Sequence, residues 1–139
     1  MRLLTFLSII LMLGLENCNV KDELVKLFID VSGNVSDDGQ PVSGALVLLL
    51  SNPSISDGVN LENGGITGSD GNYTIIKVDA GDYYVVAIDD INGNLQYDAG
   101  EDRFGFYGVN LKELKLLPKQ ITVSDSDVEN IDVTEFSTL

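Results

Sequence analysis

The chain has 139 residues, a formal net charge of −14 at pH 7, one cysteine and no histidine. The lack of histidine excludes Ser-His-Asp and Cys-His catalysis and histidine metal sites, and a single cysteine excludes an intramolecular disulfide. So acidic a chain is not expected to bind nucleic acid, or to dock on anionic lipids through its net charge.

The N-terminus has the pattern of an export signal. Arg2 precedes an apolar run over residues 3–15, which is shorter than the roughly 20 residues of a membrane-spanning helix. Cys18 follows directly, and this order resembles a bacterial lipoprotein signal, in which the cysteine is lipidated and becomes the new N-terminus. We therefore expect a signal peptide over 1–17, a lipidated tether over 18–24, and a membrane-anchored location in the bacterial cell envelope (outer membrane or cell surface). An ordinary signal peptide with an incidental cysteine is the alternative.

After the tether, the pattern is that of β-structure. Alternating apolar residues over 25–31 predict a strand that continues through 33–35. A turn is predicted over 37–41, where Gly39 is free to take a positive φ. The continuous apolar run over 45–50 predicts a strand that is buried on both faces.

The middle of the chain alternates between loops and strands. Residues 51–65 are polar and rich in glycine, which predicts a surface loop that either carries binding specificity or only connects two strands. A hairpin turn is predicted over 69–72, between strands at 66–67 and 73–77. Residues 83–88 are rich in aromatic and β-branched side chains and form the clearest predicted strand.

The last third of the chain completes the predicted domain. A strand is predicted over 104–109, residues 111–117 are ambiguous, and closing strands are predicted at 121–123 and 131–133. Short strands separated by regular turn signals predict an all-β fold, a single antiparallel β-sandwich of about seven strands. The sandwich is expected to span residues 25–139.

An acidic loop over residues 89–102 carries the one pattern that indicates a defined chemical site. Side-chain oxygens occupy positions 1, 3, 5, 9 and 12 of a twelve-residue window, which is the ligand spacing of an EF-hand-type calcium loop. These residues are Asp90, Asn92, Asn94, Asp98 and Glu101. Position 7, Gln96, would ligate through its backbone carbonyl, and Glu101 would ligate through both carboxylate oxygens. Calcium is therefore the expected cofactor, and a solvated Asn-Gly turn is the alternative.

One position departs from the calcium-loop pattern. Leu95 stands at position 6, where glycine normally makes the sharp turn. The loop nevertheless resembles the calcium-associated Asp-x-Asn-x-Asn-Gly loops of bacterial cell-surface β-domains. The resemblance implies that the ion stiffens a long connection between two strands.

The order of motifs resembles the carboxypeptidase regulatory-like domain, a transthyretin-like sandwich. Members share a glycine-started strand, a turn with glycine and proline, an apolar strand, a Thr-x-x-x-Gly-x-Tyr hairpin and a Gly-x-Tyr strand start. The matching residues here are Gly33, Gly39, Pro41, Gly44, Thr67, Gly71, Tyr73, Gly81 and Tyr83. The resemblance implies a non-catalytic accessory, adhesive or carbohydrate-associated module.

Aromatic residues beside the acidic loop suggest where a ligand would be contacted. Phe104 and Phe106 are expected to point into the core, whereas Tyr97 and Tyr107 are candidates for exposed contacts with a glycan or protein ligand. The predicted function is a surface-anchored binding or structural module stiffened by calcium. The alternative is a carboxylate-based, metal-dependent hydrolase that uses the acidic loop as its metal site.

Overall fold

The computed structural model describes residues 29–56 and 64–138. The predicted signal peptide (1–17), the tether (18–24) with Cys18, and the start of the first predicted strand lie outside these residues. Within them, no helix has the length and apolar character that crossing a membrane would require.

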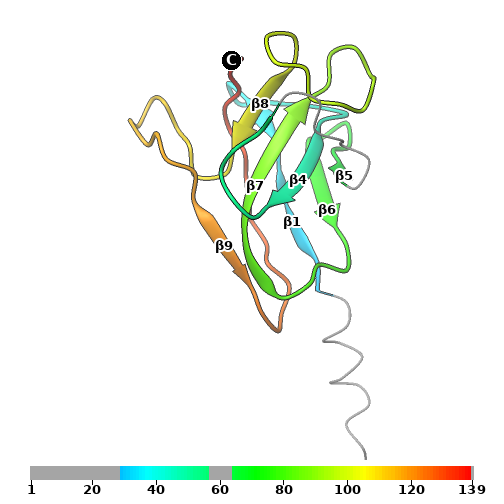
Figure 1. Ribbon diagram of the computed structural model, residues 1–139, viewed down its shortest axis with the longest axis vertical. Coiled ribbons are helices and arrows are strands. Elements are labelled where there is room, and N and C mark those ends of the chain that lie inside the picture. The colour runs from blue at the N-terminus through cyan, green and yellow to red at the C-terminus, as the bar shows by residue number, and fades with distance from the viewer. Residues whose placement is uncertain (1–28, 57–63, 139) are drawn as a thin grey trace, which may run out of the picture.

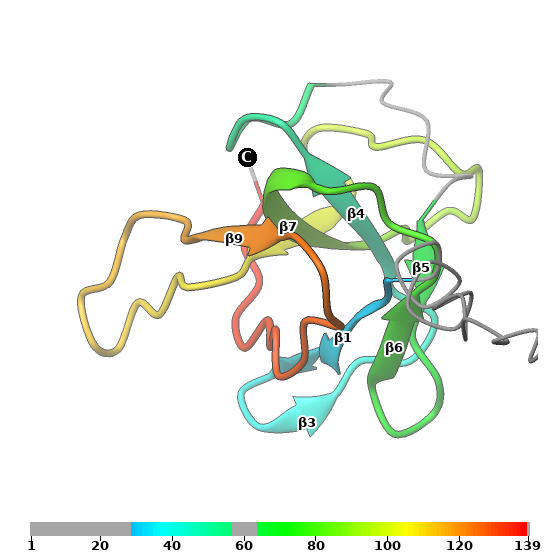
Figure 2. The same ribbon diagram turned by 90° about the horizontal axis from the view of Figure 1, so that it is seen from below.

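The described chain is all-β, and every ladder between its strands is antiparallel (Figure 1). The large sheet has the order β5-β4-β7-β8, and β9 also pairs with β7. Its strands are β4 (Leu46–Leu50), β5 (Gly65–Ile66), β7 (Gly81–Asp89), β8 (Arg103–Phe106) and β9 (Gln120–Val123). Two smaller sheets pair β1 (Val31–Asn34) with β6 (Asn72–Ile75), and β2 (Ser36–Asp37) with β3 (Gln40–Pro41). Seen from below, β1, β3 and β6 lie across from β4 and β7 (Figure 2), which is consistent with a sandwich.

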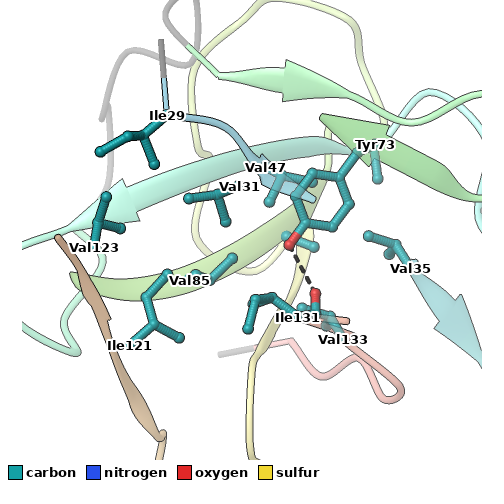
Figure 3. Packing of buried hydrophobic residues seen from close by; sticks show 12 residues of the cluster. Ile29, Val31, Val35, Val47, Tyr73, Val85, Ile121, Val123, Ile131 and Val133 are labelled. Carbon is teal, nitrogen blue, oxygen red and sulfur yellow. Dashed lines mark hydrogen bonds between the residues drawn. The ribbon is translucent and has the colours of Figure 1, made fainter. Parts of the chain in front are cut away.

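The two central strands of the large sheet are buried on both faces, as the apolar run over 45–50 predicted. Alternate residues of β4 and β7 enter two separate clusters, because successive side chains of a strand point to opposite faces. The cluster between the sheets includes Ile29, Val31, Val47, Tyr73, Val85, Ile131 and Val133 (Figure 3). The cluster on the other face contains Leu46, Leu48, Val86, Ile88, Tyr97 and Phe106. Both described clusters lie at or after residue 29, so a chain that begins at residue 19 contains all of this core.

The hairpin predicted around residues 69–72 is wrong in its pairing. The turn exists, but β5 pairs with β4 and β6 pairs with β1, so the turn carries the chain from one sheet to the other. The buried Thr67 fixes this crossing: its hydroxyl accepts a hydrogen bond from the Ala45 N–H (2.8 Å) and donates one to the Val42 carbonyl (2.6 Å).

The C-terminal prediction is also corrected. Residues 131–133 do not form a strand of a continuous ladder; their N–H groups at Ile131 and Val133 donate to the Ser32 and Asn34 carbonyls of β1, and an isolated parallel bridge joins Val35 to Val133. The approach is very close, because a Cβ added to Gly33 would lie 2.2 Å from the Ile131 carbonyl oxygen. The strand predicted over 104–109 ends at Phe106.

Candidate functional site

The acidic loop, residues 89–102, includes the connection from β7 to β8 and is closed at its base by an ion pair. Asp89 and Arg103 are register partners across the two strands. The Arg103 guanidinium contacts the Asp89 carboxylate at 2.6 Å and the Asp37 carboxylate at 2.7 Å. The hydrogen bond to Asp89 is the main cause that raises the pKa of Arg103. The base of the loop is therefore tied both to its own strands and to β2.

A buried carboxylate then joins the first and last turns of the loop. Asp102 is fully buried, and its two oxygens accept hydrogen bonds from the N–H groups of Ile91 (2.9 Å) and Asp98 (2.8 Å). A buried charge is stable only when it is well hydrogen-bonded, so these bonds are needed. Asp102 is one of the acidic residues of the loop in the sequence, but it lies just outside the twelve-residue ligand window, so the spacing does not mark it for this role.

The side chains at positions 1, 3 and 5 organise the backbone of the first half of the loop. The Asp90 carboxylate accepts hydrogen bonds from the N–H groups of Gly93 (2.8 Å) and Leu95 (2.9 Å). Asn92 and Asn94 each accept a hydrogen bond from the N–H two residues further along, at 3.0 and 2.8 Å. Such local side-chain bonds are what asparagine and aspartate contribute to tight turns.

One oxygen of Asp98 is the point where the predicted ligands meet. It accepts hydrogen bonds from the side-chain amides of Asn92 (2.8 Å) and Asn94 (2.7 Å). Asp90, Asn92, Asn94 and Asp98 therefore take part in organising one compact turn. In this arrangement the two amides present nitrogen, not oxygen, toward Asp98. A half-turn of each amide would present its carbonyl oxygen instead, and would break the bond that this oxygen accepts from the N–H two residues further along.

The remaining two predicted ligands contribute to the loop through their backbone N–H groups. Gln96 is exposed and donates its backbone N–H to Asn94, and Glu101 is exposed and donates its backbone N–H to the Asp98 carbonyl at 3.1 Å. Among the described residues, no group of three or more histidine, cysteine, aspartate or glutamate side chains is placed to hold a metal ion. Asp90, Asp98 and Glu101 thus do not form such a group.

Leu95 takes the backbone conformation that glycine usually provides at this position. Its φ is +60°, a left-handed conformation that costs a residue with a Cβ about 1–2 kcal/mol. The hydrogen bond from its N–H to Asp90 helps to hold it there. The loop therefore keeps the sharp turn at position 6 although glycine is absent.

The prediction that Tyr97 is an exposed ligand contact is wrong. Its side chain is 0% exposed and lies in the outer cluster of the large sheet. Its ring packs edge-on against Phe104, with 5.9 Å between ring centroids. A large aromatic side chain in a polar loop gains more by burial than by exposure. Tyr97 is therefore the apolar anchor of the acidic loop.

The other aromatic predictions have different outcomes. Phe106 is buried and Phe104 packs against the same cluster, so both contribute to the core as predicted. Tyr107 is half-buried against the cluster between the sheets, and the Lys119 ammonium lies 5.7 Å from its ring centroid. Its role in ligand contact stays a prediction.

A polar groove of about 410 Å³ lies at the β1–β6 sheet and was not predicted from the sequence. Its lining includes Ser32, Asn34, Asn72, Thr74, Glu129, Asn130 and Asp132. Tyr73 also borders the groove, but the hydroxyl of this buried residue is bonded to the Ile131 carbonyl. These residues are far apart in the sequence, so no local pattern reveals the groove.

No protein-family model and no curated protein matches the chain. Among solved structures, a DUF3823 family protein from Parabacteroides merdae is similar, with a TM-score of 0.37 and 16% identity. The match covers 80% of this chain and 46% of that protein, so the chain corresponds to less than half of its length.

Proposed function

We propose that the chain is a non-catalytic binding or structural module of the bacterial cell envelope, whose acidic loop holds a calcium ion. The observation that carries the proposal is the arrangement of Asp90, Asn92, Asn94 and Asp98 in one compact turn, with Leu95 in the left-handed conformation at position 6. Oxygen ligands of this kind and spacing are those that calcium prefers.

The proposal assigns each ligand a distinct part. Asp90 and Asp98 would supply carboxylate oxygens, and Asn92 and Asn94 would turn their amides to supply carbonyl oxygens. Gln96 would add its backbone carbonyl, and Glu101 would close the site from its exposed position. A cation would also relieve the repulsion between the carboxylates of the loop.

A structural role for the ion fits the way in which the loop is attached. Arg103 closes its base, Asp102 joins its turns, and Tyr97 anchors it in the outer cluster. An ion held there would stiffen the acidic loop, which packs on one face of the large sheet through Tyr97. The hydrolase alternative needs a cleft with an open coordination position, and neither the polar groove nor the apolar pocket at Phe104 and Phe136 is lined by any of the six predicted ligands.

The envelope location and the ligand are part of the same proposal. They are supported by the export-signal pattern before Cys18 and by the resemblance of the motifs to carboxypeptidase regulatory-like domains. In the polar groove, the Asn34 and Asn72 side chains are hydrogen-bonded to each other and Glu129 and Asp132 add carboxylates, and a glycan or a protein would bind among these groups. A glycan array tests this part, with Asn72→Ala expected to weaken any hit in the groove.

Thermal unfolding of residues 19–139 in calcium and in chelator tests the ion. At 100 times its dissociation constant, a ligand specific for the folded state adds about 2.7 kcal/mol, which raises the Tm of a domain of this size by several degrees. Asp90→Ala should abolish the shift, and Glu101→Ala should weaken calcium binding about tenfold, which corresponds to 1.4 kcal/mol.

The control is Asp125→Ala, which removes an exposed carboxylate outside the acidic loop and should leave the calcium shift unchanged. If calcium and chelator give the same Tm for the wild-type chain, the loop is a hydrogen-bonded turn and the calcium part of the proposal is wrong.

A further inference from the structure

A projecting segment of the molecule carries an unusual concentration of exposed leucines. Residues 109–119, here the leucine hairpin, connect β8 to β9 and extend away from the sandwich (Figures 1 and 2). Leu114 and Leu117 are each 82% exposed, and Leu111 and Leu116 are also exposed. A cluster of exposed apolar side chains on a protein surface usually marks an interaction site.

The hairpin is held in shape by hydrogen bonds. Asn110 and Lys115 exchange two backbone hydrogen bonds, at 2.8 and 2.9 Å, and the Asn110 side chain accepts one from the Glu113 N–H. The Leu111 N–H donates to the Glu135 carboxylate at 2.6 Å, which ties the hairpin to the C-terminal segment. The leucines are therefore displayed on an ordered element.

The charge of the hairpin is opposite to that of the whole chain. Of the basic residues in the described ranges, three lie here: Lys112, Lys115 and Lys119. Lys112 pairs with Asp38 and Lys115 with Glu113, and both pairs are exposed. Because exposed ion pairs contribute little free energy, these ammonium groups can exchange their partners for phosphate.

We propose that the leucine hairpin inserts into the headgroup region of a lipid bilayer. Leu114 and Leu117 would enter the boundary of the acyl chains, and Lys112 and Lys115 would reach the lipid phosphates, as amphipathic side chains do at membrane interfaces. A projecting tip favours a bilayer over a second protein, because a stable protein interface needs a broad complementary surface. The large net negative charge does not drive this contact; the leucines do.

This contact goes beyond the proposed function and does not require lipidation. If Cys18 is lipidated, the ten residues between it and Ile29 span at most roughly 35 Å, which keeps the sandwich close to the bilayer. The hairpin would then add a second attachment to the same surface. Its test uses a chain without Cys18, so the two attachments are separated.

Vesicle co-sedimentation of residues 19–139 tests the proposal, with phosphatidylcholine vesicles and with vesicles that also contain phosphatidylglycerol. The wild-type chain should bind both, and Leu114→Asp with Leu117→Asp should lower the binding constant at least tenfold. The matched control is Ile66→Asp with Ile76→Asp, which replaces two exposed apolar residues elsewhere and should leave binding unchanged. Thermal unfolding confirms that each variant folds.

A second measurement reports insertion directly. Because the test chain lacks cysteine, Leu114→Cys and Ile66→Cys each give one labelling position for an environment-sensitive fluorophore. A blue shift on vesicle addition is expected at position 114 and not at position 66. The proposal is overturned if the leucine variant binds vesicles as tightly as the wild-type chain, if the wild-type chain does not bind, or if position 114 shows no shift. A wild-type dimer that the leucine variant dissociates, without vesicle binding, would assign the hairpin to self-association instead.

Discussion

The Tyr73 hydroxyl donates a hydrogen bond of 2.7 Å to the backbone carbonyl of Ile131 (Figure 3). Both residues are buried, and they come from segments that are 58 positions apart. The bond joins β6 to the C-terminal segment, whose Ile131 and Val133 N–H groups donate to the Ser32 and Asn34 carbonyls of β1. The Tyr73 hydroxyl thus adds a side-chain bond from β6 to the backbone pairing of the C-terminal segment with β1.

Replacing Tyr73 with phenylalanine should destabilise the fold by about 1–3 kcal/mol, because the Ile131 carbonyl would stay buried without this donor. Urea unfolding of residues 19–139 measures the change. Tyr83→Phe is the matched control, since Tyr83 also donates to a backbone carbonyl, that of Asp79, but at an exposed site where water can take its place. Equal effects of the two changes would contradict the role assigned to Tyr73.

Because of the same hydroxyl, the stability difference between the wild-type chain and Tyr73→Phe should depend on pH in the alkaline range. Burial, with a smaller contribution from the negative charge of Asp132, raises the pKa of Tyr73 well above its ordinary value of 10.0. A group with a raised folded pKa stabilises the fold fully below its unfolded pKa, and this contribution is lost as the pH rises above that value. The advantage of the wild-type chain over Tyr73→Phe should therefore be constant below pH 10 and shrink above it by up to about 1.4 kcal/mol per pH unit. Urea unfolding of both proteins across this range gives the comparison, and a constant difference would contradict it.

Asp102 should be more important for the acidic loop than the exposed carboxylates. In Asp102→Asn, one carboxylate oxygen becomes an amide that cannot accept the N–H of Ile91 or Asp98, so a loss of about 1–3 kcal/mol is expected. Hydrogen exchange should show faster exchange at both amides. Asp125→Asn, at an exposed position, is the control; if it has the same effect, Asp102 is not the residue that joins the turns.

How far the sequence predicts this molecule depends on whether a feature is local. The apolar run over 45–50 predicts a strand buried on both faces, because hydrophobic pattern alone decides that outcome. The residue types at Asp90, Asn92, Asn94 and Asp98 favour a turn, which was the alternative to the calcium loop, because asparagine and aspartate bond to nearby backbone. That these residues bind calcium stays a prediction.

Features that depend on distant partners were not predictable in this way. The burial of Tyr97 depends on an outer cluster contributed mainly by β4, β7 and β8. The C-terminal segment looks like a strand in isolation, yet it meets β1 through separate backbone hydrogen bonds and isolated bridges, at a close approach that Gly33 permits. The turn over 69–72 looks like a hairpin, but the bonds of Thr67 to Ala45 and Val42 keep it between the sheets.

Leu95 offers a test that connects backbone conformation to the calcium proposal. At φ +60°, a β-branched residue is much less tolerated than leucine, whereas glycine takes this conformation without steric cost. Leu95→Val should lower stability by about 1–2 kcal/mol. Leu95→Gly should stay within about 1 kcal/mol of the wild type, because relief of strain offsets the added freedom of the unfolded chain and the lost partial burial.

The calcium-induced rise in Tm should likewise be larger for Leu95→Gly than for Leu95→Val. Leu95→Gly keeps the N–H of position 95 directed at Asp90 and should retain the full shift, while Leu95→Val should reduce it. Thermal unfolding of the three proteins in calcium and in chelator provides the measurement. If the valine variant shows an undiminished shift, the left-handed conformation at position 6 is not required for the ion, and the geometry by which the acidic loop is proposed to bind calcium must be different.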